Sequence, residues 1–180
     1  MRRAAALIAL LLTTLLVACG GDDDDSGGQS VASTTKTTTS EQPSPAQERE
    51  ALEDTSKRPH IPKPTGSPPR RLLKEDIVKG KGAPAKPGDV LTVQYVGVTF
   101  STGDEFDASW DRGQPFQFQL GGGMVIKGWD QGMVGMRKGG RRMLTIPPEL
   151  GYGRTGSPPF IGPNETLVFV FDLIGITPRS

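Results

Sequence analysis

The aromatic residues of this 180-residue chain are confined to one part of it, and this restricts where a folded core can form. All 11 of them (seven Phe, two Tyr and two Trp) lie between Tyr95 and Phe171, so the first 94 residues contribute none. Aromatic side chains bury the largest areas and dominate the energetics of cores. Because the length suits one domain with extensions, we expect a single domain over residues 67–180.

Charge and the rarest side chains exclude several classes of function. The chain has 21 basic and 20 acidic residues, a net charge of +1, which argues against a general nucleic-acid-binding protein. The only histidine is His60 and the only cysteine is Cys19, and both precede the aromatic region. We therefore expect no Ser-His-Asp or Cys-His pair, no metal site, no cofactor and no intrachain disulfide.

Residues 1–19 have the pattern of a bacterial export signal. Two arginines precede an uncharged apolar run over residues 4–17, which is shorter than the roughly 20 residues of a membrane-spanning helix. The run ends in Leu16-Val17-Ala18-Cys19-Gly20, which resembles a lipobox, whose cysteine is acylated after cleavage. We expect a lipid on Cys19 and a location on the extracytoplasmic face of a bacterial cell membrane. The alternative is an ordinary secretory signal that has a cysteine here by chance.

Residues 20–66 lack the apolar side chains that a packed structure needs. They contain an acidic run at 22–25, a Ser/Thr-rich stretch at 33–40 and five prolines. Such a composition buries too little surface to offset the entropy of ordering. We expect a disordered tether in which residues 47–54 form at most a transient helical turn and His60 is exposed to solvent.

The domain itself is rich in short β segments separated by Gly and Pro. The segments with strand character are residues 72–78, 90–98, 115–120, 141–146 and 166–176. Only residues 125–136 have a helical pattern, with Val125, Trp129 and Met133 spaced four apart. We expect an α+β fold in which an antiparallel sheet of five to six strands wraps around one short α-helix.

One glycine pattern in the domain does not predict a nucleotide site. Residues 151–156 fit a dinucleotide-binding fingerprint, but prolines precede and follow them. That fingerprint requires a helix beginning directly behind it to bind the pyrophosphate, and we therefore expect no nucleotide there.

Several different short motifs are distributed through residues 70–177. They are Phe106-Asp107, Asp111–Phe116, Leu120-Gly121, Val125–Gly132, Gly135-Met136, Ile146–Gly153 and Thr166–Phe169. Each alone is weak, but their order and spacing closely resemble the FKBP family of macrolide-binding peptidyl-prolyl cis-trans isomerases.

The resemblance implies an apolar pocket with Trp129 as its floor. It implies catalytic roles for Tyr95, Phe106, Asp107 and Tyr152. The residues that it implies for binding substrate, or a macrolide of the rapamycin or tacrolimus type, are Arg112, Phe116, Val125, Ile126, Trp129, Phe160, Ile161 and Phe169. Several of the aromatic residues could instead belong only to the hydrophobic core, and we prefer this interpretation for Phe118 and Phe171.

The sequence departs from the family pattern around the pocket. Ser157 stands where relatives often have a histidine, and Phe160 replaces a smaller aliphatic residue, which leaves the loop's shape and substrate preference open. Met124 stands where a polar residue is common, and we expect little effect because its substrate contact would be through the backbone.

The resemblance implies a monomer that rotates X-Pro bonds of exported or nascent proteins without a cofactor. Two other classes of function remain as alternatives. One is a module or holdase that binds Pro-containing segments without catalysis, and the other is a structural lipoprotein of the envelope. The intact set of site residues favours catalysis.

Overall fold

The computed structural model describes residues 44–179. The predicted export signal, the lipid-attachment site at Cys19 and the first part of the predicted tether lie outside the described residues. No helix within residues 44–179 is long and apolar enough to cross a membrane.

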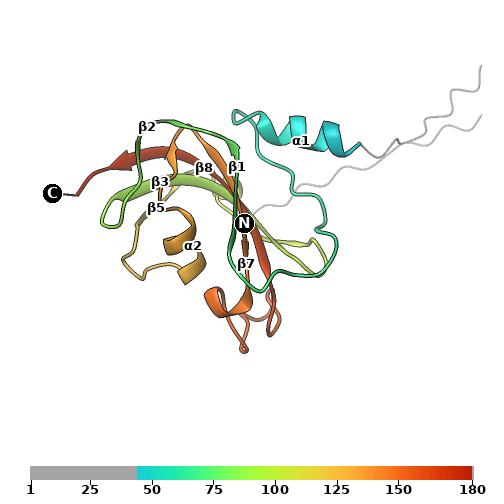
Figure 1. Ribbon diagram of the computed structural model, residues 1–180. Coiled ribbons are helices and arrows are strands. Elements are labelled where there is room, and N and C mark those ends of the chain that lie inside the picture. Colours follow the sequence, from blue (N-terminus) through green and yellow to red (C-terminus); the bar gives the residue numbers. More distant parts are fainter. Residues whose placement is uncertain (1–43, 180) are drawn as a thin grey trace, which may run out of the picture. The chain divides into compact units, whose positions relative to one another are not determined.

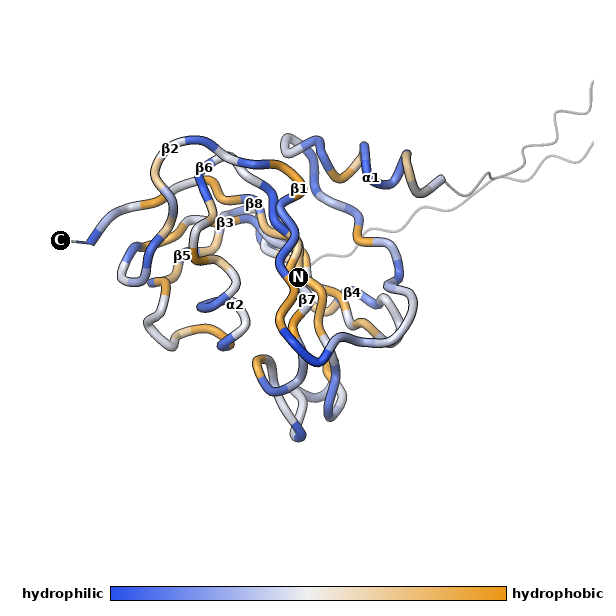
Figure 2. The backbone as a smooth tube through the Cα atoms, viewed as in Figure 1, coloured by the Kyte–Doolittle hydropathy of each residue, from blue (hydrophilic) through white to orange (hydrophobic). Residues whose placement is uncertain are grey.

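A six-stranded antiparallel sheet forms the centre of the domain (Figure 1). Five strands follow the order β1-β7-β8-β3-β4, and β5 also pairs with β3. These strands are β1 (Leu73–Val78), β3 (Val90–Thr99), β4 (Glu105–Ala108), β5 (Phe116–Gln119), β7 (Arg141–Ile146) and β8 (Leu167–Thr177). Apolar residues concentrate along β3, β7 and β8 (Figure 2). The predicted α+β fold, a sheet wrapped around one short helix, is confirmed.

A second, two-stranded sheet was not predicted. It pairs β2 (Lys81–Pro84) with β6 (Arg137–Lys138). Its strands are short and contain or adjoin Gly and Pro, so the sequence there indicates turns rather than strands.

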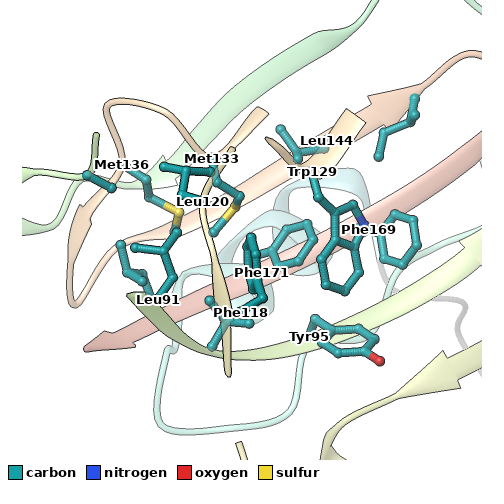
Figure 3. Packing of buried hydrophobic residues seen from close by; sticks show 14 of the residues in the cluster. Leu91, Tyr95, Phe118, Leu120, Trp129, Met133, Met136, Leu144, Phe169 and Phe171 are labelled. Carbon is teal, nitrogen blue, oxygen red and sulfur yellow. The ribbon is translucent and has the colours of Figure 1, made fainter. Parts of the chain in front are cut away.

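The short helix α2 (Lys127–Gly132) packs on one face of the sheet, which we call the inner face. It is shorter than the predicted range of 125–136. A Cβ on Gly128 would lie 2.4 Å from Cγ2 of Ile146, so only glycine lets α2 approach β7 this closely. The buried core between α2 and the sheet includes Leu91, Tyr95, Phe118, Leu120, Trp129, Met133, Met136, Leu144, Phe169 and Phe171 (Figure 3).

The opposite, outer face of the sheet is covered by residues 44–66, which we call the strap. The strap begins with α1 (Pro45–Glu53), whose first turn is closed by a capping box between Ser44 and Gln47. Leu52 and Ile61 are only 8% and 6% exposed. The apolar residues of the outer face that cluster with Ile61 are Val96, Val98, Ala108, Val168 and Val170.

The expectation of a disordered tether is therefore wrong for residues 44–66. A helix of this length and polarity is marginal alone, but tertiary contacts with the outer face order it. His60 is exposed, as expected.

Candidate functional site

The floor of the candidate site is the indole ring of Trp129, which is 6% exposed. Its ring meets Tyr95, Phe169 and Phe171 edge-on, at centroid distances of 4.8, 5.1 and 4.7 Å (Figure 3). Each such pair adds about 0.5–1.5 kcal/mol beyond simple burial. The indole N–H has no hydrogen-bond acceptor among the described residues.

A cavity of about 580 Å³ opens over this floor. This volume lies within the range of roughly 300–1,000 Å³ that is usual for small-molecule sites. The residues that line it are Tyr95, Phe106, Asp107, Arg112, Phe116, Met124, Val125, Ile126, Trp129, Tyr152 and Phe169. Most of the lining is therefore aromatic or aliphatic, with a few polar groups among it.

Phe106 and Asp107 both line the cavity although they are neighbours on one strand. Asp107 pairs with Gly97 of β3, whereas the next residue of β3 pairs with Glu105, so Phe106 is the extra residue of a β-bulge. A bulge of this kind redirects the side chains that would otherwise alternate. A Cβ on Gly97 would lie 2.5 Å from the Phe169 ring, so glycine is required where the rings of Phe106 and Phe169 meet.

The polar side of the cavity is a hydrogen-bonded group of Tyr95, Asp107 and Arg112. The Tyr95 hydroxyl donates to Oδ2 of Asp107 at 2.5 Å. The Arg112 guanidinium donates to Oδ1 of Asp107 and to the Tyr95 oxygen, both at 2.6 Å. Because the Arg112 and Asp107 side chains are 44% and 40% exposed, their pairing orients them more than it stabilises the fold.

Arg112 reaches this group because a short 3-10 helix, η1 (Trp110–Arg112), follows β4. Ser109 precedes η1, is fully buried and accepts a hydrogen bond from the Tyr95 backbone N–H at 2.8 Å. The start of η1 is thereby fixed to the strand that carries Tyr95.

Partial burial makes both tyrosines of the cavity weaker acids than usual. It raises the pKa of Tyr95 to about 12, and the hydrogen bond to Asp107 adds to this effect. Burial also raises the pKa of Tyr152, with a further contribution from the negative charge of Asp107. Both hydroxyls therefore remain neutral at physiological pH, and Tyr152 can serve as a hydrogen-bond donor.

Two of the predicted binding residues do not line the cavity. Ile161 is 4% exposed and belongs to the core, whereas Phe160 is 71% exposed. Ser157 and Ile161 exchange backbone hydrogen bonds of 2.8 and 3.0 Å, and this bridge closes a tight loop with Ile161 buried and Phe160 outside. The side chain of Met124, which we expected to matter little, lines the cavity and is 73% exposed.

The site offers an aromatic floor, apolar walls and a few oriented donors. Within residues 44–179, no three or more His, Cys, Asp or Glu residues gather as a metal site would require. The arrangement suits an apolar ring whose neighbouring carbonyl groups accept hydrogen bonds from the walls.

Comparisons with known proteins agree with this geometry. A family model described as FKBP-type peptidyl-prolyl cis-trans isomerase matches residues 81–174. An FK506-binding protein from Streptomyces anulatus is 54% identical over 120 residues, which cover 66% of this chain and 97% of the relative. The peptidyl-prolyl cis-trans isomerase FKBP2 from Mus musculus is 52% identical over 96 residues, which cover 53% of this chain and 68% of the relative.

The fold is also similar to a solved structure. The crystal structure of AtFKBP13 matches with a TM-score of 0.54 and 42% identity, covering 58% of this chain and 91% of that one. The motif series, the aromatic cavity and these matches agree, and the chain belongs to the FKBP-type peptidyl-prolyl cis-trans isomerases, a family of isomerase enzymes.

Proposed function

We propose that this isomerase acts on X-Pro bonds of exported proteins, at the extracytoplasmic face of a bacterial cell membrane to which a lipid on Cys19 ties it. The observation that supports catalysis in this cavity is its composition: an apolar floor at Trp129, with the Tyr95–Asp107–Arg112 group among its walls. The support for the location is the sequence Leu16-Val17-Ala18-Cys19.

The chemistry requires neither a nucleophile nor a proton transfer. Rotation about a peptide bond has a barrier of ~18–20 kcal/mol because resonance gives the C–N bond double-bond character. An apolar cavity disfavours the planar, charge-separated amide relative to the twisted one, whose carbonyl is less polarised. Since X-Pro isomerisation takes tens to hundreds of seconds unaided, acceleration of this step speeds folding.

Each part of the cavity has a proposed role in this reaction. Trp129 and the surrounding apolar residues receive the proline ring, and Tyr95, Phe106 and Asp107 contact the bond that rotates. The Tyr152 hydroxyl and the Ile126 backbone N–H donate to the substrate and hold it in a turn. Macrolides of the rapamycin or tacrolimus type inhibit by filling the same cavity. The other proposed binding residues are Arg112, Phe116, Val125 and Phe169.

The activity is tested with a short X-Pro peptide in a protease-coupled assay of the full chain. The chain should accelerate isomerisation, and one equivalent of tacrolimus should abolish the acceleration. Acceleration that persists with tacrolimus bound would place the reaction outside this cavity.

The location is tested by mass spectrometry of the mature N-terminus and by cell fractionation. We expect an acylated Cys19, and we expect Cys19→Ser to leave the membrane fraction. Stable retention needs more than one acyl chain, because a single chain anchors only marginally. An unmodified Cys19, or a Cys19→Ser chain that stays in the membrane as wild type does, would contradict the proposal.

A further inference from the structure

A buried arginine at the start of β7, Arg141, binds the strap to the sheet where α1 ends. Arg141 is fully buried, and all five of its N–H groups have an acceptor. Two donate to the Asp172 carboxylate at 2.6 and 2.7 Å. The other three donate to the backbone carbonyls of Leu52, Asp54 and Lys57, at 2.8, 3.1 and 2.7 Å. These hydrogen bonds fix the part of the strap that directly follows α1.

The next residue of the strap, Arg58, joins two parts of the neighbouring segment. Its Nη2 donates to Glu105 at 2.5 Å, at the start of β4, and its Nη1 donates to Asp111 at 2.7 Å, within η1. Three residues further on, Ile61 is buried in the outer-face cluster that also contains Ala108, the last residue of β4. The strap therefore contacts the segment from β4 to η1 at both ends.

This segment also carries two polar residues of the cavity. Asp107 lies two residues after Glu105, and Arg112 directly follows Asp111. Because the Asp107–Arg112 pair is substantially exposed, burial does not fix its partners. Without Arg58, the carboxylates of Glu105 and Asp111 would be free to compete with Asp107 for Arg112.

We propose that Arg58 is a positioning residue for the isomerase reaction. By binding Glu105 and Asp111 on the outer face, it keeps Arg112 on Asp107 and on the Tyr95 hydroxyl at the cavity. This inference rests on the role proposed above for Asp107 in catalysis. The strap is thereby part of the catalytic unit, although it lies on the face of the sheet opposite the cavity.

The test compares kcat/KM of the full chain and of Arg58→Gln for a short X-Pro peptide. We expect kcat/KM to fall roughly three- to tenfold at a temperature where circular dichroism shows both proteins folded. Arg49→Gln is the matched control. Arg49 is an exposed arginine of the same strap whose ion pairs are with Glu53 and Glu75, and its loss should leave kcat/KM unchanged.

Repeating the Arg58→Gln substitution in a second variant of the chain distinguishes an effect on positioning from an effect on stability. In a chain that carries Glu105→Gln and Asp111→Asn, no carboxylate is left to compete, so adding Arg58→Gln should not lower kcat/KM further. The proposal is wrong if Arg58→Gln has no effect on the wild-type chain, or if it lowers kcat/KM equally in both backgrounds.

Asp107→Asn distinguishes this inference from the proposed function. If Asp107→Asn also leaves kcat/KM unchanged, the proposed role of Asp107 fails. If it lowers kcat/KM while Arg58→Gln does not, only the positioning role fails.

Discussion

The two faces of the central sheet are buried by different means. On the inner face, aromatic rings and α2 form a core that leaves a cavity of about 580 Å³. On the outer face, β-branched side chains are covered by the strap, which depends on a buried ion pair and on Leu52 and Ile61. The cavity residues of the inner face lie within short sequence motifs, whereas the strap on the outer face is held by Arg141, which binds the backbone carbonyl of Leu52, 89 residues away in sequence.

Among the substitutions that test the difference between the two faces, removing the charge of Asp172 should have the largest effect. Burial raises the pKa of this carboxyl even though Arg141 opposes the shift, so both charges are desolvated. Asp172→Asn leaves the buried guanidinium without its counter-charge and should cost ~3–5 kcal/mol of unfolding free energy in denaturant titrations.

Removing both charges provides the control for that variant. The double variant Arg141→Met with Asp172→Leu should recover part of the loss, since no unpaired charge is left buried. A loss below ~1 kcal/mol for Asp172→Asn, as for an exposed pair, would contradict the buried anchor.

A substitution at the cavity floor should separate binding from folding. Trp129→Leu keeps an apolar side chain but removes the platform, so tacrolimus binding should weaken at least roughly 30-fold in calorimetry, as for other buried aromatic anchors. Trp110, which packs against the outer-face cluster, offers the matched control, and Trp110→Leu should stay within roughly threefold of wild type. Wild-type affinity in Trp129→Leu would show that the floor is assigned to the wrong residue.

A smaller loss is expected at the strap. Ile61→Ala removes a side chain that is only 6% exposed and should lower the unfolding free energy by about 2 kcal/mol, the low end for buried Ile because this peripheral site can relax. Ile61→Val should cost about 0.5–1.5 kcal/mol. If both variants unfold as wild type does, the strap is not packed on the sheet in solution.

The cavity of the inner face could be predicted from sequence because its residues lie in short motifs that resemble those of a known family. The motifs around Asp107, Trp129 and Tyr152 resemble those of the FKBP family, and that resemblance implied the floor and the polar residues that the cavity brings together. The loop at Phe160 and Ile161 could not be resolved in this way. Which of the two side chains turns inward depends on the backbone bridge to Ser157.

The strap was missed because its few anchoring residues are scattered through a polar segment. One signal could have indicated it. Residues 167–171 of β8, Leu-Val-Phe-Val-Phe, are apolar at every position, and both faces of this stretch are buried. Such a run is typical of a strand covered on both sides, so a second cover had to exist. Its identity could not follow, because Arg141 binds backbone carbonyls, which have no sequence signature.

Alkaline pH should weaken the fold through the tyrosines of the inner face. The folded-state pKa of Tyr95 is about 12, whereas an unfolded tyrosine titrates near ~10, so the folded state retains this proton more strongly. The stabilisation is complete below pH ~10 and is lost as the pH rises through about 12. Unfolding free energies measured from pH 9 to 12 should therefore decline, and Tyr95→Phe should reduce the decline. An identical decline in Tyr95→Phe would assign it to other groups.

The central claim is that an apolar cavity with positioned hydrogen bonds, and no acid or base, accelerates the reaction. The cavity contains no histidine, and burial raises the pKa values of both its tyrosines away from neutrality. The direct test is kcat/KM for a short X-Pro peptide measured from pH 6 to 8, the range in which a histidine would titrate. We predict a nearly flat profile for the wild-type chain and no new pH dependence in Asp107→Asn. A bell-shaped profile centred near pH 7 would require a general acid or base and would contradict this mechanism.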